Sequence, residues 1–297
     1  MTNHFNDMTN SDVMVIVGGN PAENHPATLR HIMKAREHGA EFIVIDPRFT
    51  KSAAVADKYY PLRSGSDIAL FGAIVNYLLQ NNLINEEYVK SYTNATWLVS
   101  PAYGFKDGMF TGWTEKDGKF SYDVTQWSYQ VESTTTWDTT PTGPFAWTQA
   151  PGVPKFTLPQ GSVVKKDLTL QDPQCVFQLM KKHYERYTPQ IVEDVVGMTK
   201  EQFEELAKSI GSTYTDDRVA TFMYAMGLTQ HTVGSQNIRA LSIIQLLLGN
   251  MGIAGGGVNA LRGEGNVQGS TDFALLYNNI PGYLNAPSSA KHPTFTD

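Results

Sequence analysis

The sequence predicts an α/β protein in three layers, a mainly parallel sheet with helices on both faces, and three observations support this class. Short unbroken apolar runs, such as V-M-V-I-V at residues 13–17, are typical of strands buried on both faces of a parallel sheet. Segments with helical spacing of apolar residues follow these runs, bounded by proline and glycine. The length of 297 residues is enough to bury a substantial core in one large α/β domain or two smaller ones.

The first elements form a βαβ unit. The strand at residues 13–17 ends in the turn G-G-N-P, and a helical pattern then runs from about Pro26 to Gly39. A second buried strand, E-F-I-V-I, begins at residue 41 and ends in D-P-R. Two strands joined through a helix imply a parallel pair with a right-handed crossover.

The pattern of alternating elements continues along the chain. A third short strand is predicted at residues 59–62, and either Ser66 or Asp67 is a candidate cap for the helix that follows. Residues 218–224 predict another strand. Later helical patterns cover residues 173–187, 189–196, 199–211 and 233–248.

A segment from about 97 to 168 has a different character, because it is rich in Trp, Tyr, Thr, Gly and Pro. Its K-D-G and P-T-G-P turns and weak alternation predict a long irregular insertion with short β-hairpins. Loops of this length inside a compact domain are normally functional or lie at an interface. We expect one α/β domain at residues 11–262, and we expect residues 263–297 to begin a neighbouring, incomplete domain with exposed apolar surface.

Composition disfavours several functional classes. The 23 Lys and Arg against 29 Asp and Glu give a net charge of −6, which argues against a nucleic-acid partner. The single cysteine, Cys175, provides no disulfide or cysteine-held metal site within this chain, and we expect an inert, partly buried thiol. The sequence contains no apolar run of about 18 residues, so we predict no membrane span. The first ten residues lack the pattern of a signal peptide.

Small or polar turns follow each predicted strand, and the carboxyl ends of parallel strands line one crevice where ligands bind. The first turn is not G-x-G-x-x-G, so an NAD site is not supported. Asp46 and Arg48 are candidates for gripping a ribose and base edges, or for pairing with each other. Arg63 and Asp67 present the same alternatives.

The glycine-rich stretch G-G-G-V-N-A-L-R-G-E-G-N-V-Q-G surrounds Arg262 with glycines and small amides. Such loops approach ligands closely and present backbone N–H groups to anions. Arg262 adds a planar cationic fork suited to carboxylate or phosphate; the alternative is a flexible surface loop with a solvated arginine. His25 and His231 lie in predicted turns as possible ligands or proton carriers, although lone histidines are more often structural.

Together these stretches resemble the catalytic (alpha) subunit of molybdenum- or tungsten-dependent formate dehydrogenases, within the bis-molybdopterin guanine dinucleotide oxidoreductases. The similarity extends over nearly the whole chain, and two stretches are specific: M-Y-A-M-G-L-T-Q-H-T-V-G-S-Q-N-I-R and L-L-L-G-N-M-G-I-A-G-G-G-V-N-A-L-R-G-E-G-N-V-Q-G. The resemblance is strongest to the exported, respiratory-type enzymes. It implies a periplasmic enzyme that oxidises formate to CO2 and passes electrons to an iron–sulfur subunit.

The resemblance also implies roles for individual residues. Arg262 would bind the formate carboxylate beside the metal, and Met226, Gln230 and Gln268 would contact the pterin cofactor. One guanosine end of the cofactor would lie in a pocket lined by Asn20, Asp46, Arg48, Gly65 and Asp67.

Several family features are not in this sequence. The selenocysteine or cysteine that binds the metal would lie upstream of M-T-N-H, as would the cysteines of a [4Fe–4S] cluster, and we assign no metal ligand here. We therefore expect the central part of a subunit, inactive alone, whose reading frame starts at Met1 because an upstream selenocysteine codon was taken as a stop. The alternatives are a non-catalytic nucleotide- or cofactor-binding module, or a family oxidoreductase for nitrate, thiosulfate or arsenate.

Overall fold

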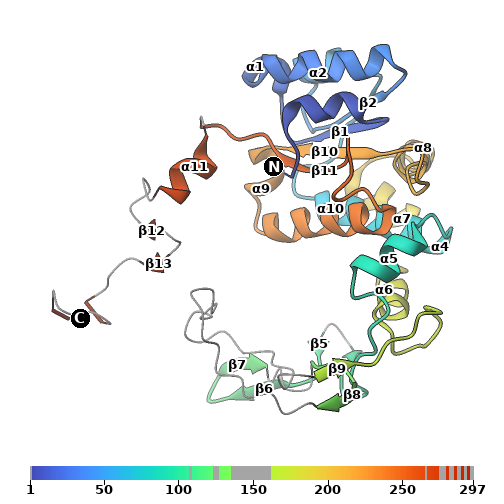
Figure 1. Ribbon diagram of the computed structural model, residues 1–297, viewed down its shortest axis with the longest axis vertical. Helices are drawn as coiled ribbons and strands as arrows, with labels where there is room; N and C mark the ends of the chain where they lie inside the picture. Colours follow the sequence, from blue (N-terminus) through green and yellow to red (C-terminus); the bar gives the residue numbers. More distant parts are fainter. Residues whose placement is uncertain are drawn as a thin grey trace.

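A five-stranded sheet lies at the centre of the computed structural model, in the order β11-β10-β1-β2-β3 (Figure 1). All four neighbouring strand pairs are parallel, which confirms the predicted α/β class. The strands are β1 (Val13–Val17), β2 (Glu41–Ile45), β3 (Lys58–Tyr60), β10 (Ala220–Tyr224) and β11 (Gly257–Ala260). The structure describes residues 2–106, 109–122, 127–134, 162–264, 266–273, 279–280, 284–285, 289–290 and 293–294.

Helices cover both faces of the sheet. The described helices are η1 (Phe5–Asn10), α1 (Pro21–Asn24), α2 (Pro26–Glu37), α3 (Lys51–Ala54), α4 (Asp67–Gln80), α5 (Glu86–Tyr92), α6 (Val176–Tyr184), α7 (Pro189–Ile191), the π-helical η3 (Val192–Val196), α8 (Lys200–Gly211), α9 (Met226–Thr229), α10 (Gly234–Leu248) and α11 (Val267–Asp272). Figure 1 shows α2 on one side of the sheet and α10 on the other.

The side chains of β1 explain why its sequence is apolar without interruption. Val13, Val15 and Val17 belong to the core that packs against α4, α8 and α10. Met14 and Ile16 belong to a second core that contains α2 and η1 residues. Every β1 side chain is therefore buried, as expected for a strand in the middle layer of three.

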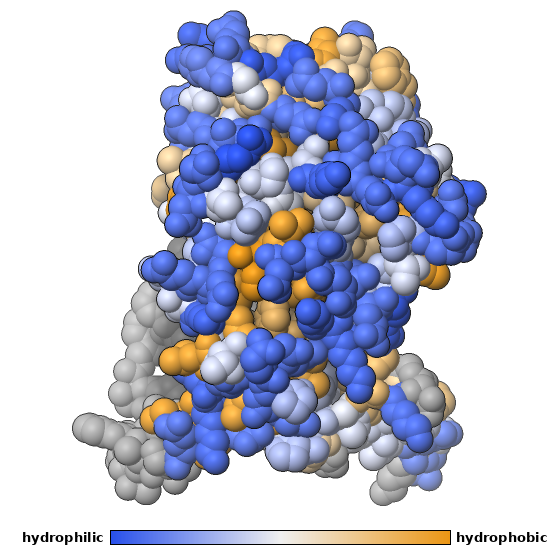
Figure 2. Space-filling view, turned by 90° about the vertical axis from the view of Figure 1, so that its right-hand side faces the viewer, coloured by the Kyte–Doolittle hydropathy of each residue, from blue (hydrophilic) through white to orange (hydrophobic). Residues whose placement is uncertain are grey.

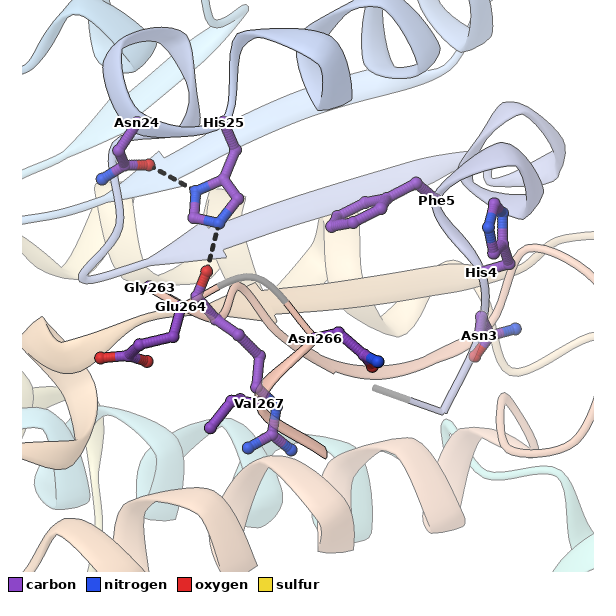
Figure 3. Close-up of a pocket in the computed structure, with 10 residues that line it drawn as sticks. Asn3, His4, Phe5, Asn24, His25, Gly263, Glu264, Asn266 and Val267 are labelled. Carbon is purple, nitrogen blue, oxygen red and sulfur yellow. Dashed lines mark hydrogen bonds between the residues drawn. The ribbon is translucent and has the colours of Figure 1, made fainter. Parts of the chain in front are cut away.

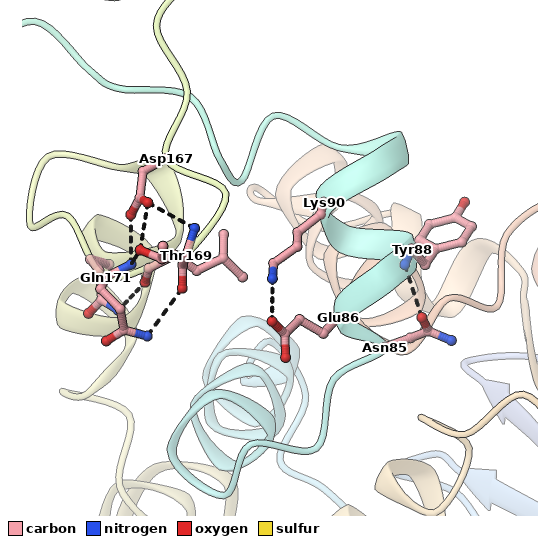
Figure 4. Close-up of polar contacts among 9 residues, drawn as sticks. Asn85, Glu86, Tyr88, Lys90, Asp167, Thr169 and Gln171 are labelled. Atoms are coloured by element: carbon pink, nitrogen blue, oxygen red, sulfur yellow. Dashed lines mark hydrogen bonds and ion pairs between the residues drawn. The ribbon is translucent and has the colours of Figure 1, made fainter.

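Local signals set the ends of the longer helices. Thr199 and Gln202 form a reciprocal capping box at the start of α8. The helix α10 ends at Gly249, which has the left-handed φ of +77° that glycine tolerates. Asn85 caps α5 by accepting a hydrogen bond from the Tyr88 amide at 3.0 Å (Figure 4).

Some element predictions differ from the structure. The third strand spans Lys58–Tyr60 rather than residues 59–62, because Pro61 has no N–H to continue the ladder. Ser66 occupies the N-cap position of α4, but its hydroxyl donates to the Arg63 carbonyl at 2.6 Å and does not cap the helix. The short helices α1, α3 and α9 have four residues each, too few for a periodic pattern.

Three antiparallel strand pairs lie within the part of residues 97–168 that the structure describes. They are β4 (Phe105–Lys106) with β5 (Met109–Phe110), β6 (Trp113–Lys116) with β7 (Lys119–Tyr122), and β8 (Val131–Thr134) with β9 (Ser162–Val164). Residues 107–108, 123–126 and 135–161 of the expected insertion lie outside the described residues.

A tight turn leads from this region back to the α/β core. The Asp167 carboxylate accepts hydrogen bonds from the amide of Asp172 and from those of Thr169 and Gln171, both labelled in Figure 4. These bonds lower the Asp167 pKa to about 2. The chain then reaches Cys175 at the start of α6. This thiol is fully buried rather than partly buried, and burial raises its pKa, consistent with the expected inert role.

The surface and the C-terminal region complete the fold. Figure 2 shows a largely hydrophilic face with a hydrophobic strip near its middle. The helix α11 and the short strands β12 (Asn279–Ile280) and β13 (Leu284–Asn285) lie away from the central sheet (Figure 1). In the part of the chain that the structure describes, no helix combines the length and apolar character of a membrane span.

Candidate functional site

The turns after β1, β2 and β10 meet at one edge of the sheet and surround a cavity of about 470 Å³. Asn20 follows β1 and Met226 follows β10, while Asp46 and Arg48 follow β2; all four line this cavity. The carboxyl ends of the parallel strands therefore converge, as the sequence predicted.

A second cavity of about 220 Å³ adjoins the first and shares Gly18, Asp46 and Gly227 with it. Its other walls include Asp67 at the start of α4 and His231 after α9. Asp46 thus lies in the walls of both cavities.

Two glycines form the contact between the β1 turn and the β10 turn. The Gly227 amide donates to the Gly18 carbonyl at 3.1 Å. A Cβ atom at Gly227 would lie 2.6 Å from that carbonyl oxygen, and Gly18 itself has a φ of +57°. Only residues without a side chain permit this approach, so the two turns are held together by backbone alone.

The Asp46 side chain is only partly exposed, and its carboxylate accepts a hydrogen bond from the Arg48 backbone amide at 2.8 Å. Burial raises the pKa of Asp46, while the Arg48 amide and guanidinium oppose the shift. The Tyr59 hydroxyl donates to the Asp46 carbonyl at 3.0 Å and fixes the turn. A carboxylate in this setting is a strong acceptor for N–H groups of a ligand.

Asp67 lies close to the imidazole of His231, with Nε2 3.6 Å from its carboxylate. Burial is the main cause that raises the pKa of Asp67; nearby Asp46 adds to the rise, and His231 and the Gly65 amide oppose it. His231 also contacts the Gly227 carbonyl oxygen at 2.6 Å. Asp67 does not pair with Arg63, whose guanidinium donates instead to the Asp194 and Val195 carbonyls.

Asn20 is buried and its amide is engaged with the protein. The side-chain oxygen accepts from the Ser52 amide at 3.2 Å and from the Ser52 hydroxyl at 2.8 Å. The side-chain nitrogen donates to Glu23. Asn20 therefore joins the β1 turn to α3, and what it offers to the cavity is its backbone and one remaining N–H.

The other predicted site residues lie around this edge. Arg48 and Met226 are exposed, and Gln230 donates to the Met226 sulfur at 3.3 Å. Gly65 has a φ of +86° and open space where a Cβ would lie. The backbone of Gln268 is in α11, but its side chain is outside the described residues.

Arg262 lines a third cavity, of about 670 Å³, after β11, where Figure 3 shows its neighbours Gly263 and Glu264. The opposite wall comes from the N-terminal segment, where Asn3, His4 and Phe5 lie. This segment is held beside β11, because the Asn3 amide donates to the Asn259 side chain at 3.1 Å. His25 and Gly263 line both this cavity and the one of about 470 Å³, so the two adjoin.

Sequence reasoning missed two parts of the site. The stretch around Arg262 was predicted as a glycine-rich loop, but Gly257–Ala260 form the edge strand β11. The contribution of the N-terminal segment was also missed, since no local pattern links residues so distant in the chain. Among the described residues, no group of three or more His, Cys, Asp or Glu side chains could hold a metal ion.

The adjoining cavities at the carboxyl ends of the strands define an α/β protein with the ligand-binding edge that is typical of open parallel sheets. The molybdopterin oxidoreductase family model matches residues 1–291, and the chain belongs to this family. It is 46% identical over 289 residues to the formate dehydrogenase-O major subunit of Escherichia coli strain K12, covering 97% of this chain and 26% of that protein.

Two further relatives agree. The chain is 44% identical over 297 residues to formate dehydrogenase subunit alpha of Megalodesulfovibrio gigas, covering 100% of this chain and 26% of the relative. It is 43% identical to the formate dehydrogenase major subunit of Haemophilus influenzae, covering 97% and 25%. The chain thus spans about a quarter of the length of these relatives, and the resemblance inferred from the sequence is confirmed.

Proposed function

We propose that this chain is the cofactor-binding α/β part of a formate dehydrogenase catalytic subunit, which oxidises formate to CO2. The names of its relatives support this assignment. The observation that carries it is the convergence of three strand ends on Asp46, whose half-buried carboxylate lies in the walls of two adjoining cavities.

The cofactor in this proposal is bis-molybdopterin guanine dinucleotide with molybdenum or tungsten. The cavity residues fit its guanosine end, because guanine carries N–H donors and the carboxylates of the half-buried Asp46 and the buried Asp67 are acceptors. Arg48 and the backbone at Asn20 and Gly65 would bind ribose and phosphate oxygens. When bound, the metal–pterin group supplies the two-electron chemistry, and the protein fixes its position.

The remaining candidate residues would contact other parts of the cofactor or the substrate. Met226, Gln230 and Gln268 would contact the pterin. Arg262 would hold the formate carboxylate through a bidentate, charge-assisted pair, since its guanidinium borders the cavity of about 670 Å³. The exposed position of Arg262 suits a group that meets a small anion arriving from solvent.

The domain arrangement follows from the same assignment. We propose the α/β domain at residues 11–262 with an insertion at about 97–168, and a neighbouring domain that starts in residues 263–297. In the whole enzyme, an N-terminal part would carry the metal-binding Sec or Cys and a [4Fe–4S] cluster. A separate iron–sulfur subunit would accept electrons, and the complex would be periplasmic.

Complementation tests the proposal. The chain is co-produced with separately encoded N- and C-terminal parts of the subunit, and metal content and formate-dependent dye reduction are measured. We expect metal and activity to be recovered together, with Asp46→Asn lowering metal content. We expect Arg262→Ala to raise the KM for formate about 100-fold at unchanged metal content, the loss expected for charged hydrogen bonds. Assembly without metal, or without formate oxidation, contradicts the proposal.

A further inference from the structure

His25 lies at the boundary between the cavity that Arg262 lines and the cavity that Asp46 lines, and it belongs to the wall of both. It is the residue between α1 and α2, directly before Pro26. The 12-residue helix α2 packs against the sheet through Ile32 and Ala35. The imidazole is therefore mounted on a well-anchored element beside an exposed loop.

The ring joins this element to the backbone of the arginine loop. Its Nε2 lies 2.6 Å from the carbonyl oxygen of Arg262, and its Nδ1 lies 2.7 Å from Oδ1 of Asn24 (Figure 3). Before this point, the Leu261 amide donates to the Tyr224 carbonyl at 2.7 Å, and Leu261 is buried. Among the described residues, the hydrogen bond of His25 to the Arg262 carbonyl is the next contact along the chain after the Leu261–Tyr224 hydrogen bond.

We propose that His25 is a positioning residue that fixes the backbone of Arg262 and thereby sets where the guanidinium meets a carboxylate. This inference rests on the proposed function. An exposed arginine has several rotatable bonds, so the position of its backbone decides the volume that the guanidinium samples. A contact that holds the Arg262 carbonyl against the α1–α2 connection restricts that volume before any ligand arrives.

The proton arrangement makes this contact durable. Both ring nitrogens face oxygen atoms, which a doubly protonated ring satisfies, because each nitrogen then donates. A neutral ring keeps its proton on Nε2 if the Asn24 amide turns over and presents its NH2 group to Nδ1. Because a carbonyl oxygen can only accept, Nε2 carries the proton in the contact with Arg262, and replacing the ring removes this donor.

The experiment compares His25→Ala, His25→Gln and a control, His38→Ala, which alters an exposed histidine at the end of α2. Amide hydrogen exchange at Leu261 is followed in the chain itself, and the KM for formate and metal content are measured in the complemented enzyme. In His25→Ala we expect Leu261 exchange and the KM each to rise about tenfold, the loss of one hydrogen bond, at unchanged metal content. His25→Gln, whose amide keeps a donor near the Nε2 position, should recover most of both values, and His38→Ala should match the parent.

Two results overturn the inference in different ways. If His25→Ala leaves the KM unchanged while Arg262→Ala raises it, His25 does not position the arginine, and the proposed function stands. If Arg262→Ala itself leaves the KM unchanged, the carboxylate role of Arg262 is wrong, and the proposed function fails together with the inference.

Discussion

The two walls of the site are built in opposite ways. At the junction of β1 and β10, Gly18 and Gly227 touch through their backbones, and Asn20 is 8% exposed with its amide bonded to neighbouring residues. After β11, the residues Arg262 and Gly263 are exposed. The contrast teaches that the wall carrying Asn20 and the two glycines is fixed by packing, whereas the wall carrying Arg262 is a loop held by few contacts.

Charge is divided in the same way. The packed wall carries Asp46 and Asp67, and burial raises the pKa of both carboxyl groups. The exposed wall carries Arg262 near His4 and His25. The separation is incomplete, because Arg48 lines the same cavity as Asp46 and Glu264 lines the cavity of Arg262.

Gly227→Ala should produce the largest effect. The new Cβ would meet the Gly18 carbonyl oxygen at 2.6 Å, so the two turns must separate, and the free energy of unfolding should fall by about 3 kcal/mol. Gly263→Ala is the matched control in the exposed wall, because no atom of the described residues lies within 4 Å of the position that its new Cβ would take. Urea unfolding measures the stability of both variants. Equal unfolding midpoints would show that the Gly227 wall is no more tightly packed than the Gly263 wall.

Asn20→Ala should have the next largest effect. It leaves the buried amide and hydroxyl of Ser52 without their acceptor, which should cost about 2 kcal/mol of stability. A double-mutant cycle with Ser52→Ala isolates the pair. We expect clear coupling between the two substitutions; strictly additive losses would show that Asn20 does not act as the joint between the β1 turn and α3.

Asp67→Asn should change the pH dependence of stability by a smaller amount. The folded protein holds the Asp67 proton more tightly than the unfolded chain, because burial raises its pKa above the ordinary 3.8. The contribution of Asp67 to the free energy of unfolding is therefore most favourable at low pH. It declines as the pH rises from about 3.8 through the pKa of the folded state. Thermal unfolding from pH 4 to 8 should show a shallower decline in the variant. A steeper decline would mean that the ion pair with His231 outweighs burial.

The sequence predicted the central layer well because its strands carry a strong local signal. Residues 13–17 and 41–45 are apolar throughout, apart from Glu41, as burial on both faces requires. Proline marks the start of α2, and glycine marks the end of α10. The edge strand Gly257–Ala260 was missed, because the glycines that lead into Val258 resemble a loop. Its pairing with β10 is a tertiary contact that composition does not reveal.

Part of the site was predicted because the same strand signals place the turns that carry its residues. Asp46 and Asp67 follow the neighbouring parallel strands β2 and β3, so topology brings them to one edge. The contact of His25 with the Arg262 backbone joins residues 237 positions apart, and the segment around His4 reaches its place through backbone pairing with β11. Contacts of this range depend on the folded sheet and have no signature in a local motif.

The most direct test of the central claim, that the carboxyl ends of the strands bind a guanosine nucleotide, is an NMR titration of this chain with GMP and with AMP. Asp46 offers acceptors that match the N–H groups of guanine, so GMP should shift amide signals of residues 18–20, 46–48 and 226–227 at lower concentrations than AMP. The Asp46→Asn variant should lose this preference. Equal responses to the two nucleotides, or shifts confined to other surfaces, would contradict the account.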